Sequence, residues 1–339
     1  MSDLMNGYFS KNALRMTFIA SVVSRKGVAL IADSLVTTSK PVLEFDDFFN
    51  YLGSARKDEA GEIIIDTTEV VRLFKTKPSY TQDYHEKLFQ YDKYTSIAIA
   101  GAAYLNGKSI EEIIHGAIRK YKPNAKANKK TIDQKVEELQ NYFSGEVLET
   151  HAKGEMARYT VLIITHYLAD EQKTKIFKFT IHKSSAADQD VEGFEPVTVA
   201  LQDESFKVVC DGQNRISERI LWGELDFLFE IIPRITQKVF TDFGIENAAI
   251  LPKYINELFS DSEILPPGFY DDIKMLKIVE LSLQQAIDLA CLLMKIERDI
   301  QGYTENIPTV GGVIKIAVID REGFRFIAGN DLTVLKEFK

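Results

Sequence analysis

A threonine and an aspartate stand at the two ends of a predicted β-hairpin near the beginning of the sequence. Thr17 precedes the apolar run 18–24, a polar turn follows at 25–27, and a second apolar run over 28–32 leads to Asp33. Two short apolar runs joined by a tight polar turn are typical of a buried hairpin. The segment therefore places a threonine at the head of one strand and an aspartate at the end of the next.

Thr17 has the chemistry of a nucleophile if it is the first residue of a mature chain. A threonine hydroxyl reacts poorly until a base takes its proton, and a free α-amino group, with a pKa of about 8, can be that base. The β-methyl group also restricts χ1 and so helps to hold the hydroxyl in one direction. Met16 directly precedes Thr17, so loss of residues 1–16, or a start at Met16 followed by its removal, would expose the amine. The alternative is that Thr17 only begins a strand, where threonine is common.

Three blocks of the sequence resemble the β-type subunits of the proteasome and follow one another in the family's order. The first contains Thr17, Gly27 and the pair Asp33-Ser34, and in that family it carries an N-terminal threonine. The second, 87–103, resembles the next hairpin of the family, which carries its catalytic lysine. The third, 311–320, opens with two glycines and is similar to the strand that closes the family's sheet.

The resemblance implies a role for each of five residues. Thr17 would be the nucleophile and, through its amine, the base. Lys87 would lower the proton affinity of that hydroxyl and amine, and Asp33 would hold Lys87 by a charge-assisted bond. Gly101 would present its backbone N–H to the oxyanion of a tetrahedral intermediate, and Asp211 would stand near the terminal amine. Taken singly, Asp33 is as well explained as a turn or cap residue, and Lys87 as a solvated lysine at a strand end.

Several positions depart from the family pattern. Asp211 stands where a serine is usual, which makes it either a substitute acceptor for the terminal amine or a sign that the site has changed. Residues 307–310 read Ile-Pro-Thr-Val where the family has an aspartate and a serine. Met16 replaces the glycine that usually precedes the threonine in self-processing precursors. This favours removal of Met16 by an aminopeptidase over autolysis, or no exposure of Thr17 at all.

Two functions therefore stay open at this point. The first is a threonine-dependent peptidase or other amide hydrolase that works through an acyl-enzyme, with a peptide or protein as substrate. The second is a catalytically inactive, proteasome-like scaffold or binding subunit. In either case the resemblance implies a homo-oligomer, such as a ring, and leaves open whether an unfoldase partner exists.

Composition is consistent with a single large globular domain over 17–339, preceded by a leader or non-native start over 1–16. The chain has 339 residues, of which 45% are hydrophobic and 27% charged, and its net charge of −9 argues against a general nucleic-acid surface. No apolar run approaches the ~20 residues of a membrane span, so we expect no membrane partner and a cytoplasmic location. Cys210 and Cys291 lie in apolar contexts typical of free thiols in a reducing compartment.

We expect no metal and no cofactor. The histidines of the chain show no metal-ligand spacing, and each is better explained as a surface or core residue. They are His85, His115, His151, His166 and His182.

The order of predicted elements indicates two facing sheets with helices outside. Helices are predicted over 109–121, 131–151 and 281–300, and a broken helix with Pro233 and Pro252 as interruptions over 214–259. Later strands are predicted over 159–167, 174–181, 196–201, 206–210, 313–319 and 324–327. Strands, two helices, strands, two helices and final strands predict an α+β chain folded as a four-layer αββα sandwich of two antiparallel sheets, the fold of N-terminal nucleophile hydrolases.

Residues 36–86 form an insertion between the first two blocks, longer than the link the family uses there. Within it, 62–66 and 70–74 are predicted to be two short strands joined by a turn. One interpretation is an extra surface hairpin that covers an edge strand. The other is a lid or oligomer contact beside the active site, because the insertion follows the strand that leads to Asp33.

Overall fold

The computed structural model of the protein describes residues 17–82, 85–121, 130–202, 207–223, 225–244, 257, 278, 280–303 and 308–329. In this part of the chain the fold is mixed α+β and contains two five-stranded sheets, and every described strand pair is antiparallel. The predicted fold class is confirmed to that extent. The predicted leader, residues 1–16 with Met16, lies outside the described residues.

The first sheet contains the predicted hairpin. Across the sheet its strands are β12 (Val208–Gly212), β1 (Phe18–Ser24), β2 (Gly27–Ala32), β13 (Lys315–Asp320) and β14 (Gly323–Ala328). Ser24 pairs with Gly27 at the turn of the hairpin, and Ile19 pairs with Ala32 toward its open end. Thr17 and Asp33 therefore lie at the same end of neighbouring strands. Thr17 comes one residue before β1, and Asp33 one residue after β2.

The second sheet carries the segment that leads from Lys87. Across the sheet its strands are β11 (Val197–Gln202), β10 (Lys173–Ile181), β9 (Thr160–Leu168), β6 (Thr95–Gly101) and β5 (Leu88–Asp92). A short ribbon of β7 (Tyr104–Leu105) and β8 (Lys108–Ser109) follows β6. Lys87 stands directly before β5, at one end of this sheet.

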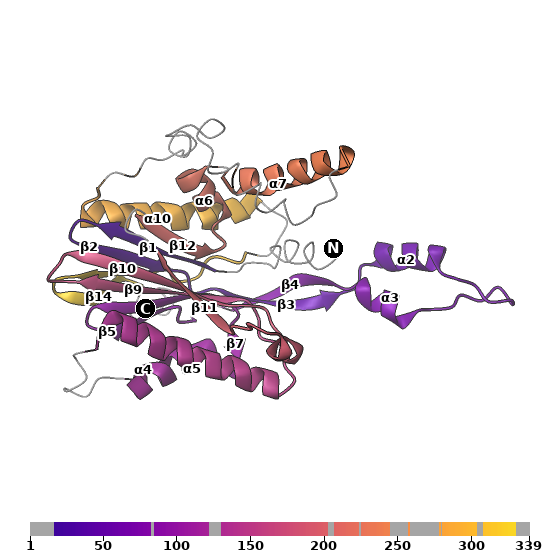
Figure 1. Ribbon diagram of the computed structural model, residues 1–339, viewed down its shortest axis with the longest axis horizontal. Coiled ribbons are helices and arrows are strands. Elements are labelled where there is room, and N and C mark those ends of the chain that lie inside the picture. Colours follow the sequence, from indigo (N-terminus) through magenta and orange to yellow (C-terminus); the bar gives the residue numbers. More distant parts are fainter. Residues whose placement is uncertain are drawn as a thin grey trace, which may run out of the picture.

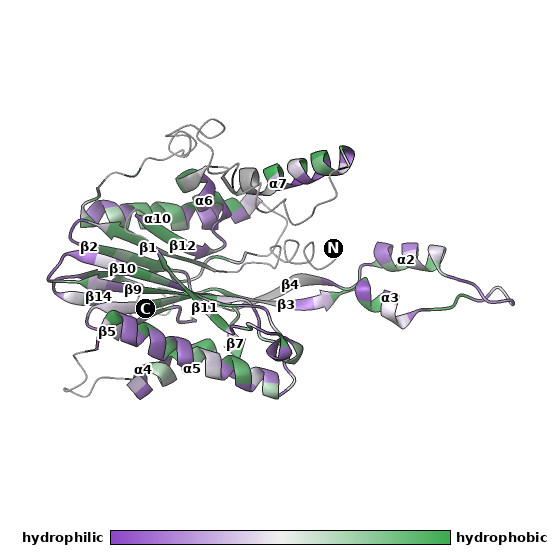
Figure 2. Cartoon of the chain, viewed as in Figure 1, coloured by the Kyte–Doolittle hydropathy of each residue, from purple (hydrophilic) through white to green (hydrophobic). Residues whose placement is uncertain are grey.

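An apolar core lies between the two sheets. Ile19 and Leu30 of the first sheet and Ile163 and Ile176 of the second belong to one buried cluster. Alternate side chains of a strand point to opposite faces, so the neighbouring residues face the helices instead. Figure 2 shows the strands as the most continuously apolar part of the body, with polar residues on the outer sides of the helices.

Helices cover the outer face of each sheet (Figure 1). Over the first sheet lie α6 (Arg215–Trp222) and α10 (Leu283–Ile300), which is followed by the turn η3 (Gln301–Tyr303). The helix α7 (Leu225–Asp242) lies on the same side, farther from the sheet. Over the second lie α4 (Ile110–Tyr121) and α5 (Ile132–Ala152), and the turn η2 (Ala186–Asp190) follows β10. Phe18 and Leu293 share one buried cluster on the first side, and Leu162 and Phe143 share another on the second.

Capping residues explain why two of these helices begin where they do. The Thr131 hydroxyl accepts from Gln134 N, and the Ser282 hydroxyl accepts from Gln285 N. In each case the glutamine side chain accepts in turn from the backbone N–H of the capping residue. Such capping boxes satisfy N–H groups that have no partner inside the helix. The predicted helices over 131–151 and 281–300 are confirmed.

The prediction for 214–259 was only partly right. The break in this region comes at Gly223, between α6 and α7, whereas Pro233 lies inside a continuous α7. Proline lacks an N–H and therefore removes one bond from the helix without always ending it. Pro252 lies outside the described residues.

The insertion forms an arm that projects from the body (Figure 1). Its stalk is a ribbon of β3 (Val36–Val42) and β4 (Lys75–Gln82), and its tip carries α2 (Phe45–Ser54) and α3 (Thr67–Arg72). The two predicted strands were wrong: 67–72 is helical, and Ile63 forms only an isolated bridge with Lys57. Asp66 caps α3 by accepting from Thr68 N at 2.8 Å, which satisfies a helix terminus and outweighs the strand preference of the β-branched residues.

Candidate active site

Lys87 joins Thr17 to Asp33. Its Nζ lies 2.6 Å from Thr17 Oγ1 and 3.0 Å from Asp33 Oδ1, and it also donates to the Leu35 carbonyl. The three side chains come from three strand ends: Thr17 precedes β1, Asp33 follows β2 and Lys87 precedes β5. Each of the three residues is at most 5% exposed. The structure therefore brings together three of the five residues that the sequence singled out.

Asp33 is held on several sides. Its carboxylate accepts from the backbone N–H groups of Phe18 at 3.1 Å, Leu35 at 3.2 Å and Gly311 at 3.1 Å, in addition to Lys87. Complete burial raises the pKa of the Asp33 carboxyl, and the Lys87 ammonium with the Phe18 and Gly311 N–H groups opposes that rise. Asp33 can thus orient Lys87 and two backbone segments at once.

The Lys87 ammonium can favour the deprotonated form of the Thr17 hydroxyl. A cation that donates to an oxygen stabilises the charged state of that oxygen more than the neutral one. Because both side chains are almost fully buried, water screens this interaction little. The Thr17 hydroxyl therefore lies beside a fixed positive charge.

The backbone of Thr17 is fixed at both its N–H and its carbonyl. Thr17 N donates to Thr309 O at 2.9 Å, and Gln213 N donates to Thr17 O at 2.5 Å. The Thr309 hydroxyl donates to Gln213 Oε1, so the three residues form a closed ring of hydrogen bonds. Thr17 has φ of +91°, which is a strained value for a β-branched residue and persists only where the surroundings enforce it.

Gly212 makes room for this arrangement. Its φ is +91°, and a Cβ atom there would lie 2.0 Å from Thr17 O. Only glycine combines this φ with such a close approach to another backbone.

Asp211 has other described partners than Thr17. It lies in β12 opposite Ile19, is 1% exposed, accepts from Gly212 N at 2.6 Å and forms an ion pair with Lys178 of β10. Burial lowers the pKa of Lys178, but the Asp211 carboxylate more than compensates and raises it above its usual value. Thr17 N has Thr309 O as its acceptor, so a role for Asp211 at a free amine stays a prediction.

Gly101 ends β6, opposite Thr160, with φ of +113°. A Cβ atom there would lie 2.5 Å from Tyr159 O, so close packing of two backbones is a sufficient reason for this glycine. The preceding Ala100 has its Cβ beside Gly212, which places the end of β6 near the Thr17 backbone. The oxyanion role of Gly101 stays a prediction.

Sequence reasoning missed the residues that hold the Thr309 segment. Gln301 accepts from Thr309 N at 2.5 Å and from Val310 N at 3.1 Å. The only signal was the departure from the family pattern at 307–310, and nothing in the sequence around Gln301 distinguishes it from an ordinary residue at a helix end. Ile307 lies outside the described residues.

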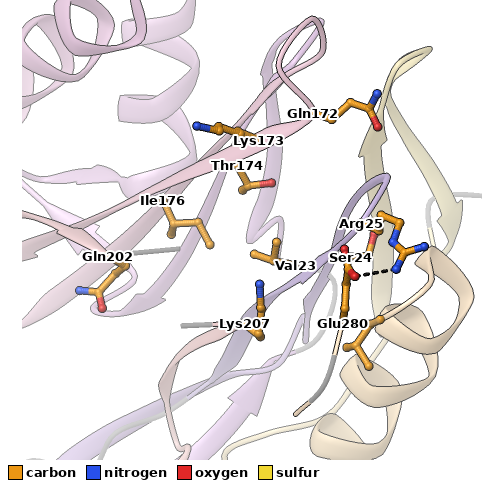
Figure 3. Close-up of a pocket in the computed structure, with 11 residues that line it drawn as sticks. Val23, Ser24, Arg25, Gln172, Lys173, Thr174, Ile176, Gln202, Lys207 and Glu280 are labelled. Atoms are coloured by element: carbon orange, nitrogen blue, oxygen red, sulfur yellow. Dashed lines mark hydrogen bonds and ion pairs between the residues drawn. The ribbon is translucent and has the colours of Figure 1, made fainter. Parts of the chain in front are cut away.

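A pocket lies at the far end of β1 (Figure 3). Val23, Ser24 and Arg25 line it from the turn of the hairpin, and Arg25 forms an ion pair with Glu280 at 2.6 Å. The pocket begins at Val23, near the end of β1, and Thr17 precedes the start of that strand, a length of roughly 20 Å at the usual rise per residue. The pocket is therefore not part of the Thr17 site.

Among the described residues, no three histidine, cysteine or carboxylate side chains form a group suited to a metal ion. No helix in that part of the chain has the length and apolar character needed to cross a bilayer. No protein-family model and no curated protein matches the chain.

Proposed function

We propose that the protein is a threonine-dependent peptidase or amide hydrolase that resembles proteasome β subunits. The observation that carries the proposal is the position of Lys87 Nζ, which is within hydrogen-bond distance of both Thr17 Oγ1 and Asp33 Oδ1 in a buried site. The two antiparallel sheets with helices on both outer faces support a four-layer αββα sandwich of the N-terminal nucleophile hydrolase type. A peptide or protein substrate, a homo-oligomeric state and a cytoplasmic location belong to the same proposal.

The reaction requires a chain that begins at Thr17. The free amine takes the hydroxyl proton while Oγ1 attacks the substrate carbonyl, and the Lys87 ammonium stabilises the negative charge that forms on Oγ1. The Gly101 N–H is the proposed donor to the oxyanion. The protonated amine then gives its proton to the leaving nitrogen, so the amide bond breaks and an ester to Thr17 remains. Water hydrolyses that ester with the amine again as base.

The test combines the mass of the natural product with active-site variants. We expect the protein expressed from its native gene to have the mass of a chain beginning at Thr17, and an electrophilic threonine-directed inhibitor to add to that residue. Thr17→Ala should abolish turnover of a peptide library without unfolding the protein, whereas Thr17→Ser should keep part of it because serine also carries a hydroxyl. Unchanged activity in the Thr17→Ala variant would exclude the proposal.

The second candidate, an inactive scaffold or binding subunit, is favoured by the arm. Large apolar side chains at its tip are strongly exposed, with Phe45 75%, Phe49 63% and Val71 67% accessible. The Phe45 and Phe49 rings stack with their centroids 5.6 Å apart, and contiguous exposed apolar surface is typical of interaction sites. A natural product that retains residues 1–16 and forms no adduct at Thr17 would favour this second function.

A further inference from the structure

We infer that Gln301 is the positioning residue for the reactive end of the chain, an inference that rests on the proposed function. Gln301 follows α10 and is 5% exposed. Its Nε2 donates to Glu297 O at 2.8 Å, one turn back in the helix. A carbonyl can only accept and a backbone N–H can only donate, so these partners determine which end of the amide is the oxygen. That oxygen is directed at the segment 308–311.

The Gln301 oxygen gathers two donors from consecutive residues. It accepts from Thr309 N at 2.5 Å and from Val310 N at 3.1 Å, while the Thr309 hydroxyl, 3.3 Å away, donates its hydrogen to Gln213 Oε1. Thr309 is 4% exposed and Val310 is 1% exposed, so water does not replace this oxygen where it is missing. A buried N–H left without an acceptor is costly, and the segment would therefore move to find another one.

The segment held by Gln301 reaches two of the three residues in the site. Thr309 O accepts from Thr17 N at 2.9 Å, and Gly311 N donates to Asp33 Oδ2 at 3.1 Å. Gln301 thus fixes the position of the Thr309 carbonyl, which would accept from the terminal amine. It also fixes the Gly311 N–H, which donates to the Asp33 carboxylate. In the proteasome family an aspartate and a serine hold the terminal amine, whereas in this chain the side-chain amide of Gln301 holds the segment that accepts from it.

The mechanism gives this support a measurable consequence. The amine must direct its lone pair at the Thr17 hydroxyl, and an N–H fixed on Thr309 O restricts its rotation. A carbonyl acceptor also favours the protonated amine, so its displacement lowers the pKa of that amine. Loss of Gln301 should therefore reduce the rate and move the acidic limb of the pH–rate profile to lower pH.

The test compares Gln301→Met, Gln301→Glu and the control Glu297→Gln. Methionine has similar size but no strong acceptor, whereas a glutamate oxygen can still accept from Thr309 N and Val310 N in either protonation state. Glu297 lies one turn away and accepts from Ser217 N at 2.6 Å, so its variant perturbs the end of α10 without changing the side chain that holds Thr309.

Amide hydrogen exchange in the full-length chain is the first readout, and it does not depend on turnover. In Gln301→Met we expect exchange at Thr17 N and Gly311 N to accelerate by about tenfold or more, because their segment loses its anchor. Gln301→Glu should restore most of the protection, and Glu297→Gln should leave it unchanged. Equal exchange in Gln301→Met and in the unmodified chain would overturn the inference, as would equal acceleration in Gln301→Met and Glu297→Gln.

Kinetics of the form that begins at Thr17 are the second readout. We expect Gln301→Met to lower kcat by about ten- to a hundredfold with little change in KM, because positioning acts on the reacting atoms more than on substrate binding. The acidic limb should move to lower pH in Gln301→Met and stay in place in Glu297→Gln. Loss of kcat without movement of the limb would overturn the inference. If the form that begins at Thr17 and keeps Gln301 has no activity, the proposed function fails. The exchange measurement on the full-length chain still decides whether Gln301 holds Thr17.

Discussion

Lys87 Nζ lies 2.6 Å from Thr17 Oγ1, although 70 positions of the sequence separate the two residues. Lys87 precedes a strand of one sheet and Thr17 a strand of the other, so the contact exists only because the sheets stack with these strand ends together. Asp33 closes the arrangement at 3.0 Å from the same nitrogen. Each charge of this buried pair compensates the other, so the two side chains should show a measurable coupling free energy.

Substitution of Asp33 alone should destabilise the fold strongly. Asp33→Asn removes the charge that compensates the buried Lys87 ammonium, and breaking a buried pair in this way typically costs about 3–5 kcal/mol. In the double variant with Lys87→Met the uncompensated charge is gone, so we expect the total loss to be smaller than the sum of the single losses by about 1 kcal/mol or more. Urea unfolding of the four proteins gives the coupling free energy. Additive losses would show that the two side chains do not form the pair described.

Gly212 should tolerate no side chain. Gly212→Ala combines an unfavourable φ of +91° with a Cβ atom 2.0 Å from Thr17 O. We expect a loss of more than about 2 kcal/mol in the free energy of unfolding, since the two backbones must separate. Gly107→Ala is the matched control, because Gly107 also has positive φ, +69°, but no atom within 4 Å of the added carbon. Similar losses in both variants would mean that φ alone, and not the approach to Thr17, requires the glycine.

His166 should make the protein less stable in acid. Burial, with a smaller contribution from Lys135, lowers the pKa of His166 to about 4 from its ordinary 6.5. Between these two values the unfolded chain binds a proton that the folded chain does not, so the stability from this group is complete above pH 6.5. It is lost as the pH falls toward 4, and amounts to about 3 kcal/mol.

Variants isolate the contribution of His166 to that slope. His166→Gln can keep a bond to Thr95, which contacts the ring at 2.8 Å, but does not titrate. We expect its free energy of unfolding to fall less than that of the unmodified protein between about pH 7 and about pH 4.5. His115→Gln changes an exposed histidine of α4 and is the control. Identical slopes for the unmodified protein and His166→Gln would contradict the prediction.

The body should fold without the arm tip. Each residue of 43–75 is at least partly exposed, and Val42 pairs with Lys75 at the end of the stalk. Replacement of residues 43–74 by an Asn-Gly turn should therefore close the ribbon as a hairpin. We expect the melting temperature of the body to change by less than about 2 °C, because little apolar burial is lost. A fall of more than about 5 °C in calorimetry would show that the tip stabilises the body.

Some features of this protein follow from local patterns in the sequence. Alternating and continuous apolar runs determine the β1–β2 hairpin, and the hairpin alone places Thr17 and Asp33 at one edge, because adjacent antiparallel strands return to the same end. The Thr131 and Ser282 capping boxes likewise define the starts of α5 and α10 within a few residues. These features depend on neighbours in the sequence, so a single chain is enough to predict them.

Other features depend on contacts between distant segments, and only the tertiary structure decided them. The stacking of the two sheets brings Lys87 to Thr17, and the return of the chain after α10 brings Gln301 and Thr309 to the Thr17 backbone. Periodicity does not encode such contacts, because they arise from the packing of whole elements. The contact of Lys87 with Thr17 was expected only from the resemblance of the sequence blocks, and the contacts of Gln301 were not expected at all. In the arm, the cap at Asp66 favours a helix over the strand preference of the β-branched residues that follow it, and in the described part of the chain these residues do not pair with a strand.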